Sequence, residues 1–173
     1  RKTLNLFKPH IVHFTCHGSF ESRDGMGHIF LASSEQGHRG FDAVNSFRLA
    51  SLLHEPGSVR FVFLNTCHGA AQDPISTFSG IAECLHANGI PAVAALQFML
   101  FERTAHAITL NLYRHLLRDR LSIEESVTRI RQYLFLNNHS FSECFGLALF
   151  QGNSSLVWQL ETPTTDGKTA TAQ

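Results

Sequence analysis

Short apolar runs and longer segments with helical spacing alternate along the chain. Each run is five or six residues long and is bounded by polar or turn-forming residues, which is typical of strands buried on both faces. The predicted strands are Ile11–Thr15, Arg60–Asn65, Ala92–Leu96 and Gly146–Phe150. The predicted helices are Phe47–His54, Phe78–Asn88, Thr104–Arg118 and Ile123–Leu136. This alternation predicts an α/β fold with a mainly parallel sheet flanked by helices.

Turn-forming and capping residues mark several boundaries of these elements. Ser122 and Glu125 have the spacing of a capping box, and Gly89 follows a helical segment just before a strand. The glycine- and serine-rich stretch Gly25–Gly40 contains a short apolar segment, which predicts a loop or a β-hairpin. Residues 161–173 are rich in threonine and have no large apolar side chain. They predict a disordered tail or linker after a single domain over residues 1–160.

The composition narrows the class of protein and its partners. With 43% hydrophobic residues, a chain of 173 residues can bury one core, and the 14 basic and 14 acidic side chains balance. That balance offers no basic surface to nucleic acid or anionic lipid, and no apolar run approaches the roughly 20 residues that cross a bilayer. Four cysteines in apolar runs favour free thiols in a reducing cytoplasm. We therefore expect a cytoplasmic domain that binds neither nucleic acid nor membrane directly and uses no cofactor.

Two predicted strands end in similar motifs. Residues 13–18 read His-Phe-Thr-Cys-His-Gly, and residues 65–69 read Asn-Thr-Cys-His-Gly. Because ligands bind beyond the carboxyl ends of parallel strands, we expect His17 and Cys67 at one rim of the sheet. An imidazole beside a thiol favours the thiolate and can protonate a departing amine, which is the chemistry of a cysteine nucleophile. The backbone N–H groups of Gly18 and Cys67 are candidates for an oxyanion hole.

The spacing of these two motifs and the order of four sequence blocks point to a family. His17 and Cys67 are 50 residues apart, and caspase-like peptidases place a histidine about 50 residues before the cysteine. The blocks, in chain order, are Pro9–Gly18, Val62–Cys67, Gly89–Leu96 and Phe145–Gly152. As an ordered set they resemble the CHAT domain of bacterial caspase-like cysteine proteases.

The resemblance implies a caspase-like fold and a cysteine endopeptidase, a hydrolase that cleaves a specific protein or peptide substrate through a Cys67–His17 dyad. Gly18 maps onto the oxyanion contact. Gln97 and Phe98 fall in a region that borders the substrate, which caspase-like enzymes bind as an added β-strand. CHAT domains commonly follow helical repeats that sense a partner, so the resemblance also implies a regulatory repeat domain upstream.

The chain departs from the family pattern near the cysteine and at its beginning. His68 stands where CHAT sequences often have an acidic residue, and Asn65 stands where metacaspases have an acid that receives Arg or Lys. Asn65 is therefore a candidate substrate contact. We expect a weaker preference for Arg or Lys in the substrate than an acid at this position would give. The family fold begins with strands that precede the histidine strand. We expect these strands to be absent from this chain, which starts at Arg1 about ten residues before the predicted strand. We expect a piece of a larger protein, with an incomplete sheet and the strand of His17 at its edge.

Several of these residues also have a plainer interpretation. Gln97 and Phe98 fit an ordinary strand-to-helix connection. Asp73, a candidate sensor of a basic substrate side chain, also fits an exposed loop charge. His68 either lines a substrate pocket or is exposed without function.

Three other functions remain alternatives. Zinc-ligand residue types occur at His13, Cys16, His17, Cys67 and His68. These residues lack the tight pairs of zinc sites, so we expect no metal. Cys16 should point away from the cleft because side chains alternate along a strand. A reversible Cys16–Cys67 disulfide would instead make the domain a redox sensor.

A caspase-like scaffold that binds proteins without catalysis is the principal rival. Cys84 and Cys144 are expected to pack as small apolar residues.

Overall fold

The computed structural model describes residues 2–21, 25–32, 40–66, 74–97 and 100–152. Its elements run in chain order α1 (Lys2–Phe7), β1 (Ile11–Glu21), β2 (Met26–Ala32), β3 (Phe41–Asn45), α2 (Ser46–His54), β4 (Phe61–Thr66), α3 (Pro74–Ala87), β5 (Ala92–Leu96), α4 (Glu102–Tyr113), the π-helical turn η1 (Arg114–Arg118), α5 (Ile123–Leu136), α6 (Phe141–Cys144) and β6 (Leu147–Gln151). Cys67, His68, Asp73, Phe98 and the predicted tail over residues 161–173 lie outside the described residues.

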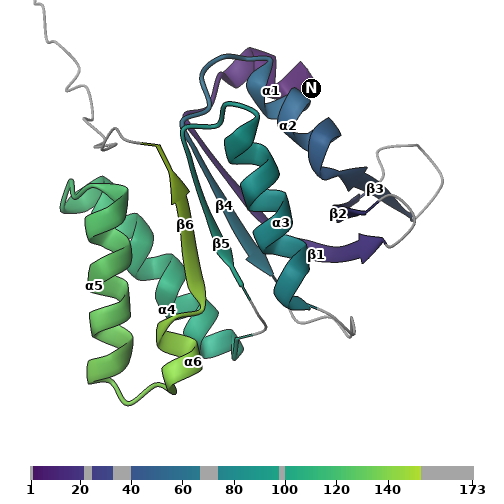
Figure 1. The fold of residues 1–173 in the computed structure, drawn as a ribbon. Helices are drawn as coiled ribbons and strands as arrows, with labels where there is room; N and C mark the ends of the chain where they lie inside the picture. Colours follow the sequence, from purple (N-terminus) through teal and green to yellow (C-terminus); the bar gives the residue numbers. More distant parts are fainter. Residues whose placement is uncertain (1, 22–24, 33–39, 67–73, 98–99, 153–173) are drawn as a thin grey trace, which may run out of the picture.

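Six strands of the described chain form one sheet in the order β3-β2-β1-β4-β5-β6 (Figure 1). The pairs β1–β4 and β4–β5 are parallel, whereas β1–β2, β2–β3 and β5–β6 are antiparallel. Because β3 opposes β2, it shares the direction of β1, and four of these six strands run the same way. The predicted α/β fold with a mainly parallel sheet is confirmed, and the arrangement fits a caspase-like fold.

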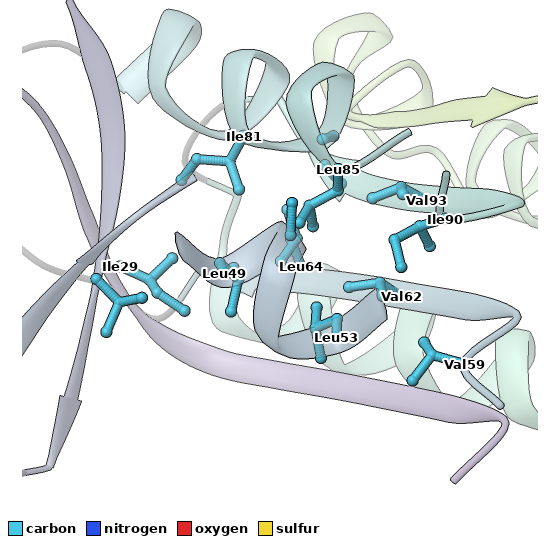
Figure 2. Packing of buried hydrophobic residues seen from close by; sticks show 14 residues of the cluster. Ile29, Leu49, Leu53, Val59, Val62, Leu64, Ile81, Leu85, Ile90 and Val93 are labelled. Carbon is cyan, nitrogen blue, oxygen red and sulfur yellow. The ribbon is translucent and has the colours of Figure 1, made fainter. Parts of the chain in front are cut away.

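Helices cover both faces of the sheet and divide the core into two clusters (Figure 1). On one face, α2 and α3 pack over Val62 and Leu64 of β4 (Figure 2). On the other face, α4 and α5 pack over Phe61 and Phe63. All four side chains are fully buried, and burial of each is worth about 1.5–3 kcal/mol. Because both faces of β4 are covered, its sequence is a continuous apolar run rather than an alternation.

Strand β1 differs most from its sequence prediction. It continues beyond Thr15 to Glu21, and its second half pairs with β2. The stretch Gly25–Gly40, predicted as a loop or a β-hairpin, contains the single strand β2, which forms antiparallel pairs with β1 before the stretch and β3 after it. The two neighbours of β1 pair with different halves of the strand, β4 with Ile11–Cys16 and β2 with His17–Glu21. Within the described residues, the first half of β1 therefore has a strand on one side only, which fits the expectation of an edge there.

The helix boundaries follow local capping chemistry, with one correction. The Ser122 hydroxyl caps α5 by accepting a hydrogen bond from the N–H of Glu125 at 3.2 Å, as predicted. The Glu125 carboxylate pairs with Arg129 at 2.8 Å instead of completing a capping box. The box occurs at α6, where Ser140 and Glu143 cap each other. Gly89, with φ of +94°, follows the end of α3 in a conformation that favours glycine.

Two further sequence expectations concern membranes and cysteines. Within the described ranges, no helix is long and apolar enough to cross a membrane. Cys144 is buried in the core under α4 and α5, as predicted for a packing residue. Cys84 is half-buried on α3, and neither thiol forms a disulfide.

Candidate active site

The two strands that precede the predicted catalytic residues are neighbours in parallel register. Ile11 pairs with Phe61, and the ladder continues to Cys16 opposite Thr66. Every pair therefore joins residues that are 50 positions apart in the chain. His17 directly follows Cys16, and Cys67 directly follows Thr66, so the spacing seen in the sequence equals the strand register.

Alternate residues of β1 face opposite sides of the sheet. Val12, Phe14 and Cys16 pack against the core under α2 and α3. His13 stacks on Phe63, whose ring belongs to the core under α4 and α5. The prediction that Cys16 points away from the face of His17 is confirmed, because the strand extends through both residues.

His17 lies on an exposed part of the sheet rather than in the core. It pairs with Phe30 of β2, and Gly18 pairs with Ile29. His17 is exposed and Gly18 is half-buried. An exposed imidazole at this position can exchange protons with a substrate or with water, which is what acid–base catalysis requires.

Asn65 is the last described side chain of β4, and it faces α4. Its Nδ2 donates a hydrogen bond to Oγ1 of Thr109 at 3.2 Å, and that hydroxyl donates to the carbonyl of Ala105 at 2.8 Å. Asn65 is only 9% exposed, and its buried Oδ1 has no hydrogen-bond partner among the residues that the structure describes. An unpaired buried acceptor typically costs about 1–3 kcal/mol, so a purely structural role does not explain this residue.

A half-buried histidine adjoins Asn65 on the same face. Nε2 of His13 lies 3.3 Å from Oγ1 of Thr15, and Thr15 is the register partner of Asn65. The His13 ring stacks on Phe63 and contacts Tyr113 in a tilted arrangement, at centroid distances of 4.7 and 5.7 Å. Burial lowers the pKa of His13 below 6.5 and raises the pKa of Tyr113 above 10.0. Both rings are therefore uncharged near neutral pH.

These residues form one polar cluster beside the first half of β1 and the carboxyl end of β4. We define the α4-face cluster as His13, Thr15, Asn65, Thr109 and Tyr113. Only Asn65 was predicted as a site residue. The others were missed because Thr109 and Tyr113 lie on a helix far along the chain. A usable signal was the polar alternation His13, Thr15, His17 within an otherwise apolar strand.

A buried polar network holds the first turn of α4. The Thr104 hydroxyl donates a short hydrogen bond to Oε1 of Glu143 and lies 3.1 Å from Nδ1 of His139. Oε2 of Glu143 accepts from the N–H and hydroxyl of Ser140 at 2.9 and 2.8 Å. The Thr104 hydrogen bond, supported by those from Ser140 and His139, lowers the pKa of Glu143 to about 2. The network thus joins α4 to α6 through a charged carboxylate.

Of the two predicted substrate contacts that follow β5, the structure describes only Gln97. Its side chain is half-buried, and its backbone N–H donates to the carbonyl of Gly146 at 2.8 Å. This bond extends the β5–β6 pairing by one position, as an ordinary strand-to-helix connection would. A substrate role for Gln97 stays a prediction.

Metal-ligand residue types and one surface groove can be compared with the predicted site over the described part of the chain. There, no group of three or more His, Cys, Asp or Glu residues has the arrangement of a metal site. A groove of about 390 Å³ lies between the start of β2 and the helices α2 and α3, with Met26, Phe47 and Cys84 among its lining residues. None of the predicted site residues lines this groove.

The comparisons with known proteins agree with this architecture. The family model of the CHAT domain matches residues 1–151, which is most of the 173-residue chain. A search of curated proteins gave no match.

Proposed function

The chain belongs to the CHAT domain family, which is caspase-like, and from this premise we propose that it is a cysteine endopeptidase. Cys67 is the proposed nucleophile and His17 the proposed acid–base partner. The substrate is a protein or peptide, cut at a peptide bond.

The strand register carries this proposal. The described β1–β4 ladder ends at Cys16 opposite Thr66, and the next residues in the two strand sequences are His17 and Cys67. We propose that the pairing continues for that one further position. Paired residues in a parallel ladder point to the same face, and neighbouring strands lie about 4.8 Å apart. An imidazole and a thiol at that separation can share a proton, which favours the thiolate. The polar α4-face cluster lies on the face to which we assign the reactive side chains. Its polarity supports that assignment, since a purely structural face would be apolar.

The proposed reaction has two halves. The Cys67 thiolate attacks the peptide carbonyl carbon, and the carbonyl π electrons move to oxygen, where the N–H groups of Gly18 and Cys67 stabilise the negative charge. The C–N bond then breaks, and protonated His17 gives its proton to the leaving amine. In the second half, His17 takes a proton from water, the resulting oxygen attacks the thioester, and the thiolate leaves.

The test is cleavage of a peptide mixture, prepared by digesting a whole proteome, by the full-length protein. We expect new amino termini with the unaltered protein and with a Cys84→Ala control, and none with Cys67→Ala or His17→Ala. Cys84 is a matched control because it is a cysteine on α3, among the residues lining the groove. Equal cleavage by the Cys67→Ala protein would overturn the proposal. Thermal melting of each variant checks that it is folded.

A further inference from the structure

We infer that residues 156–160 of this chain form a further strand, which pairs antiparallel with the open side of β6 and covers the apolar residues beside it. The open side of β6 is the side that faces away from β5. Residues 156–160 lie outside the described residues and beyond the CHAT match, which ends at residue 151. The added strand therefore depends neither on the family nor on the proposed peptidase.

The two ends of the β5–β6 ladder determine which residues of β6 bond to β5. At one end, the carbonyl of Gly146 accepts a hydrogen bond from the N–H of Gln97 at 2.8 Å. At the other end, the N–H of Gly152 donates to the carbonyl of Pro91 at 3.4 Å. Because hydrogen-bonded pairs alternate along an antiparallel ladder, the even-numbered residues of β6 bond to β5. The odd-numbered ones, such as Leu149, direct their N–H and C=O groups to the open side.

This open side of β6 has little protection in the described part of the chain. The carbonyl of Leu147, an odd-numbered residue, accepts from Nη2 of Arg131 of α5 at 2.9 Å. Among the described residues, no strand pairs with this side (Figure 1). Edge strands are usually protected by charged residues, proline or a bulge, but β6 reads Leu-Ala-Leu-Phe-Gln. Such an apolar edge is a surface on which another strand can pair.

Exposed apolar side chains lie next to this edge. Leu149 packs against the core under α4 and α5 but remains only half-buried. Phe145, just before β6, is 48% exposed, and its ring lies 5.9 Å from the guanidinium carbon of Arg131. Phe135 lies one helical turn beyond Arg131 on the same side of α5 and is 71% exposed. Large apolar groups that gather on a surface indicate that another element covers them.

The segment that follows β6 has the sequence of a matching strand. Residues 156–160 read Leu-Val-Trp-Gln-Leu, with no charge and with large apolar residues at Leu156, Trp158 and Leu160. Residues 152–155 read Gly-Asn-Ser-Ser, which are turn-forming types, and four-residue loops are common in hairpins. A two-residue loop would need a left-handed Gly152, and Gly152 does not have that conformation.

A four-residue loop sets the register of the added strand. The hydrogen-bonded pairs then join the odd-numbered residues of β6 to the large apolar residues of the segment, Gln151 with Leu156, Leu149 with Trp158 and Leu147 with Leu160. Paired residues point to the same face, so Trp158 packs beside Leu149 and next to α5. A segment tethered by four residues also has a high effective concentration at this edge, which a separate chain lacks.

Hydrogen exchange of single backbone amides in the unaltered full-length protein tests the pairing. The N–H of Ala148 bonds to β5 whether or not a further strand is present, whereas the N–H of Leu149 is protected only when a strand covers the open side. We expect Leu149 to exchange within about 10-fold of the rate of Ala148, and an open edge would make it at least about 100-fold faster.

An engineered disulfide identifies the strand that gives this protection. In the proposed register, Ala148 and Gln159 form a non-hydrogen-bonded pair with adjacent side chains, whereas Leu160 points to the other face. The double variant Ala148→Cys with Gln159→Cys should form its link within one chain at least about 10-fold faster than the control, Ala148→Cys with Leu160→Cys. Non-reducing peptide mapping measures both links, and sedimentation gives the assembly state.

Each outcome decides the inference. Slow exchange at Leu149 together with the 148–159 link inside a monomer supports it. Fast exchange at Leu149 overturns it, because the edge of β6 is then open. Slow exchange without that link, or with a link only between two copies, also overturns it and assigns the edge to another segment or to a second copy. None of these results depends on Cys67, so the proposed peptidase is tested separately.

Discussion

The two faces of the β1–β4 pair are made from alternating residues of the same strands, yet they differ in chemistry. Under α2 and α3, Val12, Phe14 and Leu64 form an apolar surface. Under α4, the register partners Thr15 and Asn65 have hydrogen-bond contacts with His13 and Thr109, and Oδ1 of Asn65 has no partner among the described residues. The apolar face accounts for stability, and the polar face contains groups that stability alone does not require.

The difference develops along the strands. At the start of β4 both faces are apolar, since Phe61 and Phe63 face α4 and are fully buried. Polarity begins with Asn65, near the carboxyl end, where parallel sheets bind their ligands. For the proposed peptidase, the position of the polar residues along β4 predicts which end of the sheet is functional, and the face that they occupy predicts which side.

The largest expected effect separates the neighbours His17 and Cys16. We expect His17→Ala to lower kcat/KM for a cleaved peptide by about 10²- to 10⁴-fold, because it removes the acid–base group. Cys16→Ala should leave kcat/KM within a few fold, since its side chain packs on the opposite face. Steady-state kinetics of the two variants measure this difference, and similar losses in both would erase the distinction between the faces.

The next effect concerns stability at Leu64 and Asn65. Leu64 is fully buried, so Leu64→Ala should lower the free energy of unfolding by about 2–5 kcal/mol. Asn65→Ala should cost less than about 1.5 kcal/mol, because it loses one hydrogen bond but also removes an unpaired acceptor. Urea denaturation provides both values. A larger loss at Asn65 than at Leu64 would show that the polar face is structural.

A smaller effect is expected from the network that anchors α4 over the polar face. The pKa of Glu143 is lowered from 4.5 to about 2 in the folded protein, chiefly by Thr104. The stability that this carboxylate contributes is therefore present above pH 4.5 and is lost as the pH falls toward 2. Glu143→Gln should be less stable at pH 7 and should show a shallower loss of stability between pH 4.5 and 2. An unchanged pH profile would contradict this role.

The smallest effect is expected at His13. Burial lowers its pKa below 6.5, so the folded protein favours the neutral ring, and stability should decline as the pH falls below 6.5. His13→Phe keeps the stacking on Phe63 and removes the titrating group. We expect its thermal melting point to vary less than that of the unaltered protein between pH 7 and 5, as scanning calorimetry would measure. A steeper variation in the variant would be the opposite of the predicted sign.

Much of the fold could be predicted because buried strands are continuous apolar runs. Ala92–Leu96 was predicted with its observed boundaries, and the helix Ile123–Leu136 likewise. The second half of β1 was missed because residues 16–21 include polar residues and glycine and are held in the sheet by pairing with β2. Local sequence does not report which strands become neighbours, so the pairing of this half with β2 could not be predicted from the apolar pattern alone.

The candidate site was predictable only in part, for a similar reason. The motif around His17 indicates a reactive residue because polar groups interrupt an apolar strand. The Asn65–Thr109 hydrogen bond joins residues 44 positions apart, and the unpaired oxygen appears only after the helix is placed. Sequence patterns identify the strand ends, whereas packing determines which side chains meet there.

The most direct test of the reactive face is the alkylation rate of each cysteine in the folded full-length protein at pH 6.5, followed by mass spectrometry. A thiol that shares a proton with His17 is partly ionised at this pH, whereas ordinary thiols are almost entirely protonated. We predict that Cys67 reacts many times faster than Cys84, and that His17→Ala abolishes the excess while Cys16→Ala preserves it. Equal rates for Cys67 and Cys84, or an excess that survives His17→Ala, would contradict it.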